Sequence, residues 1–302
     1  MKYNLSKFSP FNSVDIIRKR RFKLKFSGWI TKSILLLLLS FTLISLYSQD
    51  QAKSSGFVPH VGQAGKDVIW VPTPDELVAK MLEIAGVTEK DYVIDLGSGD
   101  GRTVIAAAKL GAMAIGIEYN PDMIEISKRK AEEAGVSSRT KFIRADLFEY
   151  DLSEATVITM FLLPDLNLKL RSRLLNLKPG TRIVSNTFTM GEWEPDFEAM
   201  TEGNWDSWYS ALMWIIPARV EGIWNLESGI LSIHQQFQMV YGTLKENDRT
   251  SVITEGRLNG NMITFNVNGA IFSGRVTGEK CMTGTMISGS VKKDWNATQK
   301  DP

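Results

Sequence analysis

Hydrophobic and polar residues follow two different patterns along this chain, with the change near residue 219. Over residues 68–218, short apolar runs alternate with stretches in which apolar residues recur every three or four positions, which predicts strands alternating with helices. From residue 219 to 302, short runs of period-two alternation are separated by turn signals, which predicts antiparallel strands. We therefore expect an α/β fold, a Rossmann-like sheet with helices on both faces, followed by a small antiparallel all-β module.

The first 67 residues have a different composition. Residues 1–32 are strongly basic, residues 33–49 are uncharged and mostly apolar, and residues 50–67 form a polar linker. The apolar segment is near the lower limit of ~17 residues for a helix that spans a bilayer. It is interpreted as a single-pass N-terminal membrane anchor, or alternatively as a signal segment cleaved on export.

Composition excludes several classes of protein. The net charge of +1 conceals the basic N-terminus, so the remaining chain is mildly acidic, and no nucleic acid partner is expected. The single cysteine, Cys281, excludes an internal disulfide, and the histidines His60 and His234 lie far apart in sequence. No metal site is therefore expected.

The stretch DYVIDLGSGDGRT, residues 91–103, contains the main candidate for ligand binding. It predicts a buried strand ending at Asp95, a glycine turn with Gly97, Ser98, Gly99 and Gly101, and a helix start. A dinucleotide-binding turn needs its third glycine one position later. An acid at the strand end also repels a pyrophosphate and attracts the cationic amino acid end of S-adenosylmethionine.

Two further strand ends supply acids. Glu118 follows an apolar run and lies roughly 20 residues after the glycines, where an acid binds ribose hydroxyls. The next strand ends at Asp146 and Leu147. Acids at three successive strand ends predict a site for S-adenosyl-L-methionine.

These motifs, together with the preceding run VPTP, resemble the class I S-adenosylmethionine-dependent methyltransferases. Within that class, residues 71–191 resemble membrane-attached protein-lysine methyltransferases, the family of the ATP synthase c-subunit lysine methyltransferase, and their bacterial relatives. The resemblance implies that Asp146 binds the adenine amino group and Leu147 packs on the ring. It also implies that Thr73 lies near the methionine end or the target amine. By its position before Pro74, Thr73 is also expected to be the N-cap of a helix.

The resemblance to class I methyltransferases also implies that the methyl acceptor meets the end of the fourth strand, Phe161-Leu162-Leu163-Pro164. No carboxylate or amide stands there to hold a flat base, so the run favours an aliphatic side chain such as protein lysine. A small molecule or lipid acceptor, and a non-catalytic binding domain, stay open as alternatives. Three residues are possible proton acceptors, but no spacing identifies a catalytic residue: Tyr119, Asp146 and Glu192.

Overall fold

The computed structural model describes residues 57–202, 209–278 and 280–300. Residues 59–302 form one compact unit. Its first part is a seven-stranded sheet in the order β3-β2-β1-β4-β5-β7-β6. Strands β1 to β5 are parallel and β7 is antiparallel to both neighbours. The strands are β1 (Tyr92–Leu96), β2 (Met113–Glu118), β3 (Thr140–Arg144), β4 (Val157–Met160), β5 (Arg182–Asn186), β6 (Phe197–Met200) and β7 (Ser210–Ile215).

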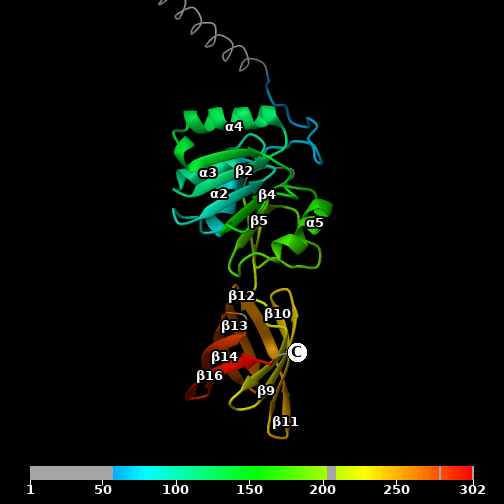
Figure 1. Cartoon of the computed structure of the whole chain (residues 1–302), viewed down its shortest axis with the longest axis vertical. Helices are drawn as coiled ribbons and strands as arrows, with labels where there is room; N and C mark the ends of the chain where they lie inside the picture. Colours follow the sequence, from blue (N-terminus) through cyan, green and yellow to red (C-terminus); the bar gives the residue numbers. More distant parts are fainter. Residues whose placement is uncertain (1–56, 203–208, 279, 301–302) are drawn as a thin grey trace, which may run out of the picture. The chain divides into compact units, whose positions relative to one another are not determined.

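The two faces of this sheet are covered differently (Figure 1). One face packs against α2 (Asp75–Ile84), α3 (Arg102–Lys109) and α4 (Pro121–Glu133). The other face packs against α5 (Pro164–Leu174) and buried residues of the loops before β4 and after β5. A short 3₁₀ turn, η1 (Ser137–Arg139), precedes β3. The prediction of a Rossmann-like sheet followed by an antiparallel β module is confirmed.

The second part is a closed antiparallel sheet. Its strands run in the order β11-β10-β12-β13-β14-β15-β16-β8-β9, and β9 also pairs with β10, which closes the barrel and leaves β11 outside the ring. Large apolar side chains such as Trp224, Phe265 and Phe272 fill its core. The strands are β8 (Gly222–Leu226), β9 (Ile230–Gln236), β10 (Met239–Glu246), β11 (Arg249–Val252), β12 (Thr254–Asn259), β13 (Met262–Val267), β14 (Ala270–Thr277), β15 (Cys281–Ser288) and β16 (Val291–Gln299).

The β9–β10 turn packs against the face of the α/β sheet that α5 covers. The Phe237 ring stacks on Trp193, with centroids 5.7 Å apart, and joins the core on the α5 face. Gln238 accepts a hydrogen bond from Trp193 Nε1 at 2.9 Å and donates one to the Glu194 carbonyl at 2.8 Å. The barrel therefore completes a layer of the α/β core. The predicted boundary between residues 218 and 219 stays a prediction.

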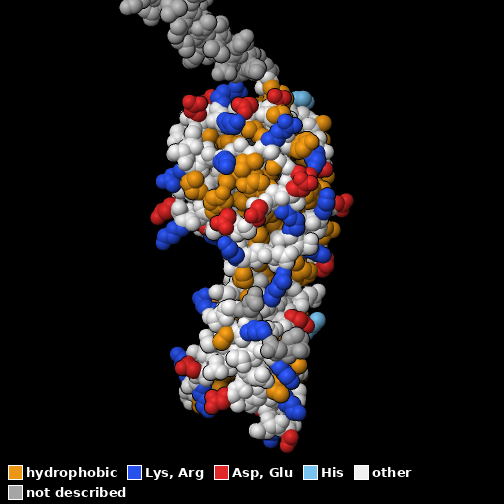
Figure 2. All heavy atoms as spheres, viewed as in Figure 1, with side chains coloured by type: hydrophobic (Ala, Val, Ile, Leu, Met, Phe, Trp, Pro, Cys, Tyr) orange, Lys and Arg blue, Asp and Glu red, His pale blue; other side chains and the backbone are white. Residues whose placement is uncertain are grey.

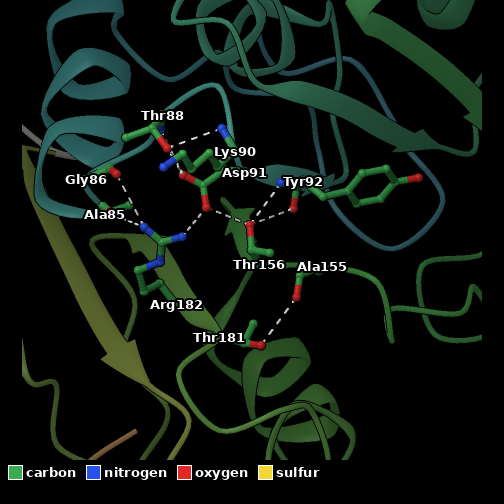
Figure 3. Close-up of polar contacts among 10 residues, drawn as sticks. All are labelled: Ala85, Gly86, Thr88, Lys90, Asp91, Tyr92, Ala155, Thr156, Thr181 and Arg182. Carbon is green, nitrogen blue, oxygen red and sulfur yellow. Dashed lines mark hydrogen bonds and ion pairs between the residues drawn. The ribbon is translucent and has the colours of Figure 1, made fainter.

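A buried acid holds the amino ends of the parallel strands together (Figure 3). The Asp91 carboxylate accepts hydrogen bonds from Thr156 Oγ1 at 2.7 Å and from the Thr88 amide at 2.8 Å, and it pairs with Arg182. Burial would raise the pKa of Asp91, but these hydrogen bonds and the guanidinium outweigh it and hold the pKa below its ordinary value. This network therefore lies at the edge of the sheet opposite the carboxyl ends of the parallel strands.

Two predictions about the N-terminal part need correction. The first is the N-cap: α2 begins after Pro74 without a side-chain cap, and Thr73 is buried with its Oγ1 accepting a hydrogen bond from Asn186 Nδ2 at 3.2 Å. Tertiary packing thus takes the hydroxyl that a helix cap needs.

The second correction concerns the membrane-anchored or exported localisation. None of the helices in the part of the chain that the structure describes is long and apolar enough to cross a bilayer. Residues 33–49, on which that prediction was based, lie outside the described residues. The localisation is therefore withdrawn.

We predict that Asp91→Asn destabilises the fold by about 2 kcal/mol at pH 7, because it leaves the Arg182 guanidinium partly buried without a counter-charge. Since the pKa of Asp91 is lowered in the folded state, its stabilisation exists at neutral pH and fades as the pH falls through that lowered value. Urea unfolding from pH 3 to 7 tests this, with the exposed Glu133→Ala as control. A constant difference at all pH values would contradict it.

Candidate active site

In the glycine turn after β1, every second residue has a left-handed backbone conformation. Gly97, Gly99 and Gly101 have φ of 75°, 53° and 79°, a region that other residues adopt only at a cost. A side chain would also collide with its surroundings. A Cβ on Gly99 would lie 2.5 Å from the Trp70 indole nitrogen, and one on Gly101 would lie 2.8 Å from Phe142. The G-x-G-x-G spacing is therefore required both by the backbone conformation and by close packing.

Hydrogen bonds attach this turn to the end of β2. The amides of Gly97 and Ser98 donate to the Ile117 carbonyl at 2.9 and 3.0 Å, and the Gly99 amide donates to Glu118 Oε2 at 2.9 Å. The turn and the second strand end are consequently one unit.

A cavity lies at this edge of the sheet. It is lined by all the residues that the sequence proposed for cofactor binding, except Gly101: Thr73, Asp95, Gly97, Ser98, Gly99, Glu118, Asp146 and Leu147. Gly101 instead packs under the turn, against Phe142 and Ser127. The cavity arises because parallel strands bring their carboxyl ends to one edge.

Asp95 is the most perturbed group in the cavity. Its side chain is buried, and its Oδ1 accepts a hydrogen bond from Thr159 Oγ1 at 2.6 Å. Burial is the main cause that raises the pKa of Asp95 to about 7, with the nearby charge of Glu118 adding to it. No Lys, Arg or His among the described residues forms an ion pair with it. A buried acid of this kind fits a ligand that brings its own cation.

Ser98 lines the cavity, but its hydroxyl points elsewhere. The Oγ is buried, has no hydrogen-bond partner among the described residues, and packs against β2, where a Cβ on Gly116 would lie 2.5 Å from it. Asp95 is therefore the group in this part of the cavity that fits the cationic end of an amino acid.

Glu118 ends β2 and Asp146 follows β3, and both line the cavity. Glu118 Oε1 accepts from the amides of Tyr119 and Asn120, each at 2.8 Å, which fixes the carboxylate in place. The Asp146 carboxylate binds Lys66 Nζ at 2.5 Å, and this interaction is the main cause that lowers the pKa of Asp146.

Residues 62–70 fold back over the cavity, in part of the segment that the sequence suggested as a linker. The chain forms a tight hairpin in which the Gly62 amide donates to the Trp70 carbonyl and the Trp70 amide to the Gln63 carbonyl, both at 2.9 Å. Lys66 also lies over the Tyr119 ring, 5.1 Å from its centroid. The polar composition that predicted a tether gave no signal for this hairpin.

Asp100 is a structurally important residue that the sequence analysis missed. It is buried and binds Arg102 Nη2 at 2.9 Å and Lys130 Nζ at 2.6 Å. Burial would raise the pKa of Asp100, but the hydrogen bonds from both cations outweigh it and lower the pKa. Arg102 Nη1 also donates to the Thr73 carbonyl at 2.9 Å, so the turn and the chain before α2 are joined. The motif GDGR contained both Asp100 and Arg102, and only their pairing was not foreseen.

The end of the cavity beyond β4 is apolar. Phe161, Leu162 and Leu163 line it as the sequence suggested, and Phe188, from the loop after β5, completes it. Of the possible proton acceptors, Tyr119 and Asp146 line the cavity. Glu192 does not; it pairs with Arg171 at 2.8 Å.

The sheet order, the glycine turn and the acids at the strand ends are those of an S-adenosylmethionine-dependent methyltransferase. Comparison with known proteins agrees. The family model of the ANTKMT methyltransferase domain matches residues 95–197, and that of a DNA methylase matches residues 46–129.

A protein-lysine N-methyltransferase from Saccharolobus islandicus is 45% identical over 142 residues, which are 46% of this chain and 84% of the relative. The chain therefore belongs to the methyltransferase family that includes this archaeal enzyme. The human ATP synthase c-subunit lysine N-methyltransferase is 36% identical over 122 residues, 40% of this chain and 51% of the human protein. A solved RNA methyltransferase from Salinibacter ruber with S-adenosyl-L-homocysteine is 47% identical, covers 50% of this chain and 96% of its own, and has a TM-score of 0.47.

We predict that Asp95→Asn stabilises the empty protein above pH 7. A carboxyl whose pKa rises from 3.8 to about 7 on folding costs stability progressively between these pH values, in total about 4 kcal/mol at about 1.4 kcal/mol per pH unit. The amide keeps the hydrogen bond from Thr159 without a charge. Thermal unfolding at pH 4 and pH 8 measures this, and a variant less stable than wild type at pH 8 would contradict it.

Proposed function

We propose that this methyltransferase modifies the ε-amino group of a protein lysine. The observation that carries the proposal is the apolar acceptor end of the cavity. Residues 160–163, Leu166 and Phe188 line it, and none of these side chains is a carboxylate or amide. A base-modifying site needs polar groups for the edge of a flat ring, whereas an aliphatic side chain needs an apolar channel.

We assign the cavity-lining residues as follows. Asp95, beside Ser98 of the glycine turn, holds the amino acid end of S-adenosylmethionine, Glu118 holds its ribose hydroxyls, and Asp146 and Leu147 hold its adenine. We assign Thr73 to the methionine end of the cofactor or to the target amine. When bound, S-adenosylmethionine supplies an electrophilic methyl group.

The chain's own contribution to transfer is alignment and desolvation. An apolar channel disfavours a charged ammonium, so it lowers the pKa of an entering lysine and favours the neutral nucleophile. This accounts for the absence of a clear general base among the described residues that line the acceptor end.

A protein acceptor is also supported by the exposed surface around the cavity. Ile69, Tyr119 and Leu163 line the cavity and are exposed. Figure 2 shows hydrophobic side chains gathered on the face of the α/β part in view, bordered by charged groups. Exposed apolar side chains at the edge of a cavity favour an acceptor that covers them, such as another macromolecule.

The acceptor is tested by incubating the full-length protein with tritiated S-adenosylmethionine and a total cell extract. We expect the label to resist nuclease and lipid extraction, and to migrate with methylated lysine after acid hydrolysis of the protein fraction. Label in the lipid or nucleic acid fraction would overturn the proposal. Asp95→Ala, which removes the proposed cofactor anchor, is the negative control.

Cofactor binding is predicted to depend on pH. Because the pKa of Asp95 is about 7, most of this carboxyl is neutral below pH 7 and cannot pair with the cofactor's ammonium. The dissociation constant should therefore increase up to about tenfold for each pH unit below 7. Calorimetry from pH 5.5 to 7.5 tests this, and Asp95→Asn should bind weakly at every pH. A wild-type affinity that is independent of pH would contradict the assignment of Asp95.

A further inference from the structure

The chain makes a strained turn directly after β5. The Phe188 amide donates to the Asn186 carbonyl at 2.6 Å, a bond between residues two apart, and the intervening Thr187 has φ of 59°. A β-branched residue in the left-handed region is unfavourable. Such turns persist only where surrounding contacts hold them, and they cluster at functional sites.

Helix α5 holds this turn in place. Asn167 is fully buried, and its Nδ2 donates to the carbonyls of Phe188 at 3.1 Å and Thr189 at 3.2 Å. One turn further along α5, Arg171 Nη1 donates to the Met190 carbonyl at 2.8 Å. Residues four apart lie on one face of a helix, so both side chains fix consecutive carbonyls of the same loop.

The consequence is the position of the Phe188 ring. It stacks with Phe161, at 6.1 Å between ring centroids and 21° between planes, and both rings line the cavity. Phe161 follows β4 and Phe188 follows β5, which are neighbouring parallel strands. The two rings form one aromatic wall at the acceptor end.

A purely structural role explains this arrangement poorly. Phe188 is only partly buried, so its ring does not complete the core on the α5 face. A loop that served only to join β5 to β6 would also gain from a glycine at position 187, where Thr187 is strained. Instead, the strained turn and the hydrogen bonds from Asn167 and Arg171 hold the Phe188 ring in an orientation that faces the cavity.

We propose that Phe188 determines acceptor specificity and that Asn167 is a positioning residue that acts through it. The inference rests on the proposed function, because it assumes that the acceptor lysine enters at this end. In this proposal the aromatic wall packs against the four methylenes of the acceptor lysine. A side chain that is one methylene shorter cannot use the whole wall.

The test compares two peptides, Ala-Ala-Lys-Ala-Ala amide and the same peptide with ornithine in place of lysine. Wild type should prefer lysine. Phe188→Ala should raise KM for the lysine peptide about tenfold and reduce the lysine preference toward one, while affinity for S-adenosylhomocysteine stays within twofold. Phe188→Leu should restore most of the preference, and Phe197→Ala, an exposed ring outside the cavity, should change nothing. Unchanged KM and preference in Phe188→Ala would overturn the inference.

The positioning role has its own variants. Asn167→Asp removes the donors and should raise KM as Phe188→Ala does, with kcat less affected. Because that variant can also lose stability, Thr187→Gly is the second test: it should raise the melting temperature by relieving strain, and yet raise KM as the turn loosens. A higher melting temperature with unchanged KM would overturn the positioning role.

Failure of the proposed function gives a different result. In that case the wild-type protein binds S-adenosylhomocysteine but neither binds nor methylates either peptide, and the inference falls with it. If the inference alone fails, the wild-type protein methylates the lysine peptide, and the Phe188 and Asn167 variants have unchanged KM and lysine preference.

Discussion

The structure depends on the link between the glycine turn and the end of β2. Three amides of the turn donate to the Ile117 carbonyl and to Glu118, and these bonds form only because left-handed glycines direct the amides there. The turn also places Ser98 in the cavity wall, close to Asp95 near the end of β1. The parallel strands bring the acids to one edge of the sheet, and this link fixes the glycine turn beside them.

The two edges of the parallel sheet divide stability and function between them. At the amino edge, Asp91 is buried together with a guanidinium and stabilises the fold. At the carboxyl edge, Asp95 is equally buried but lacks a cation among the described residues, so its ionisation opposes folding. An aspartate therefore stabilises the fold at the amino end of β1, and another aspartate at the carboxyl end reduces stability and suits a cationic ligand.

Much of the fold followed from the sequence because the relevant signals are local. Strand ends, the glycine spacing and the switch from period 3.6 to period 2 depend on residues close together in the chain, and they predicted both folded parts and the cavity residues. Thr73 was misjudged as a helix cap because its partner, Asn186, lies 113 positions away. The wall formed by Phe188 was missed for the same reason, since it depends on Asn167 and a strained Thr187. The hairpin at residues 62–70 has no periodicity from which it could be predicted.

The turn between β9 and β10 has a consequence for how the protein forms during synthesis. Phe237 and Gln238 complete a core layer, and the other residues of that layer all precede residue 217 in the sequence. When only the α/β segment has emerged from the ribosome, the sheet face that contains Trp193 is therefore not yet covered by Phe237 and Gln238. Final consolidation of the catalytic part must wait until the barrel has emerged, so a truncated chain lacking the barrel is expected to attract chaperones.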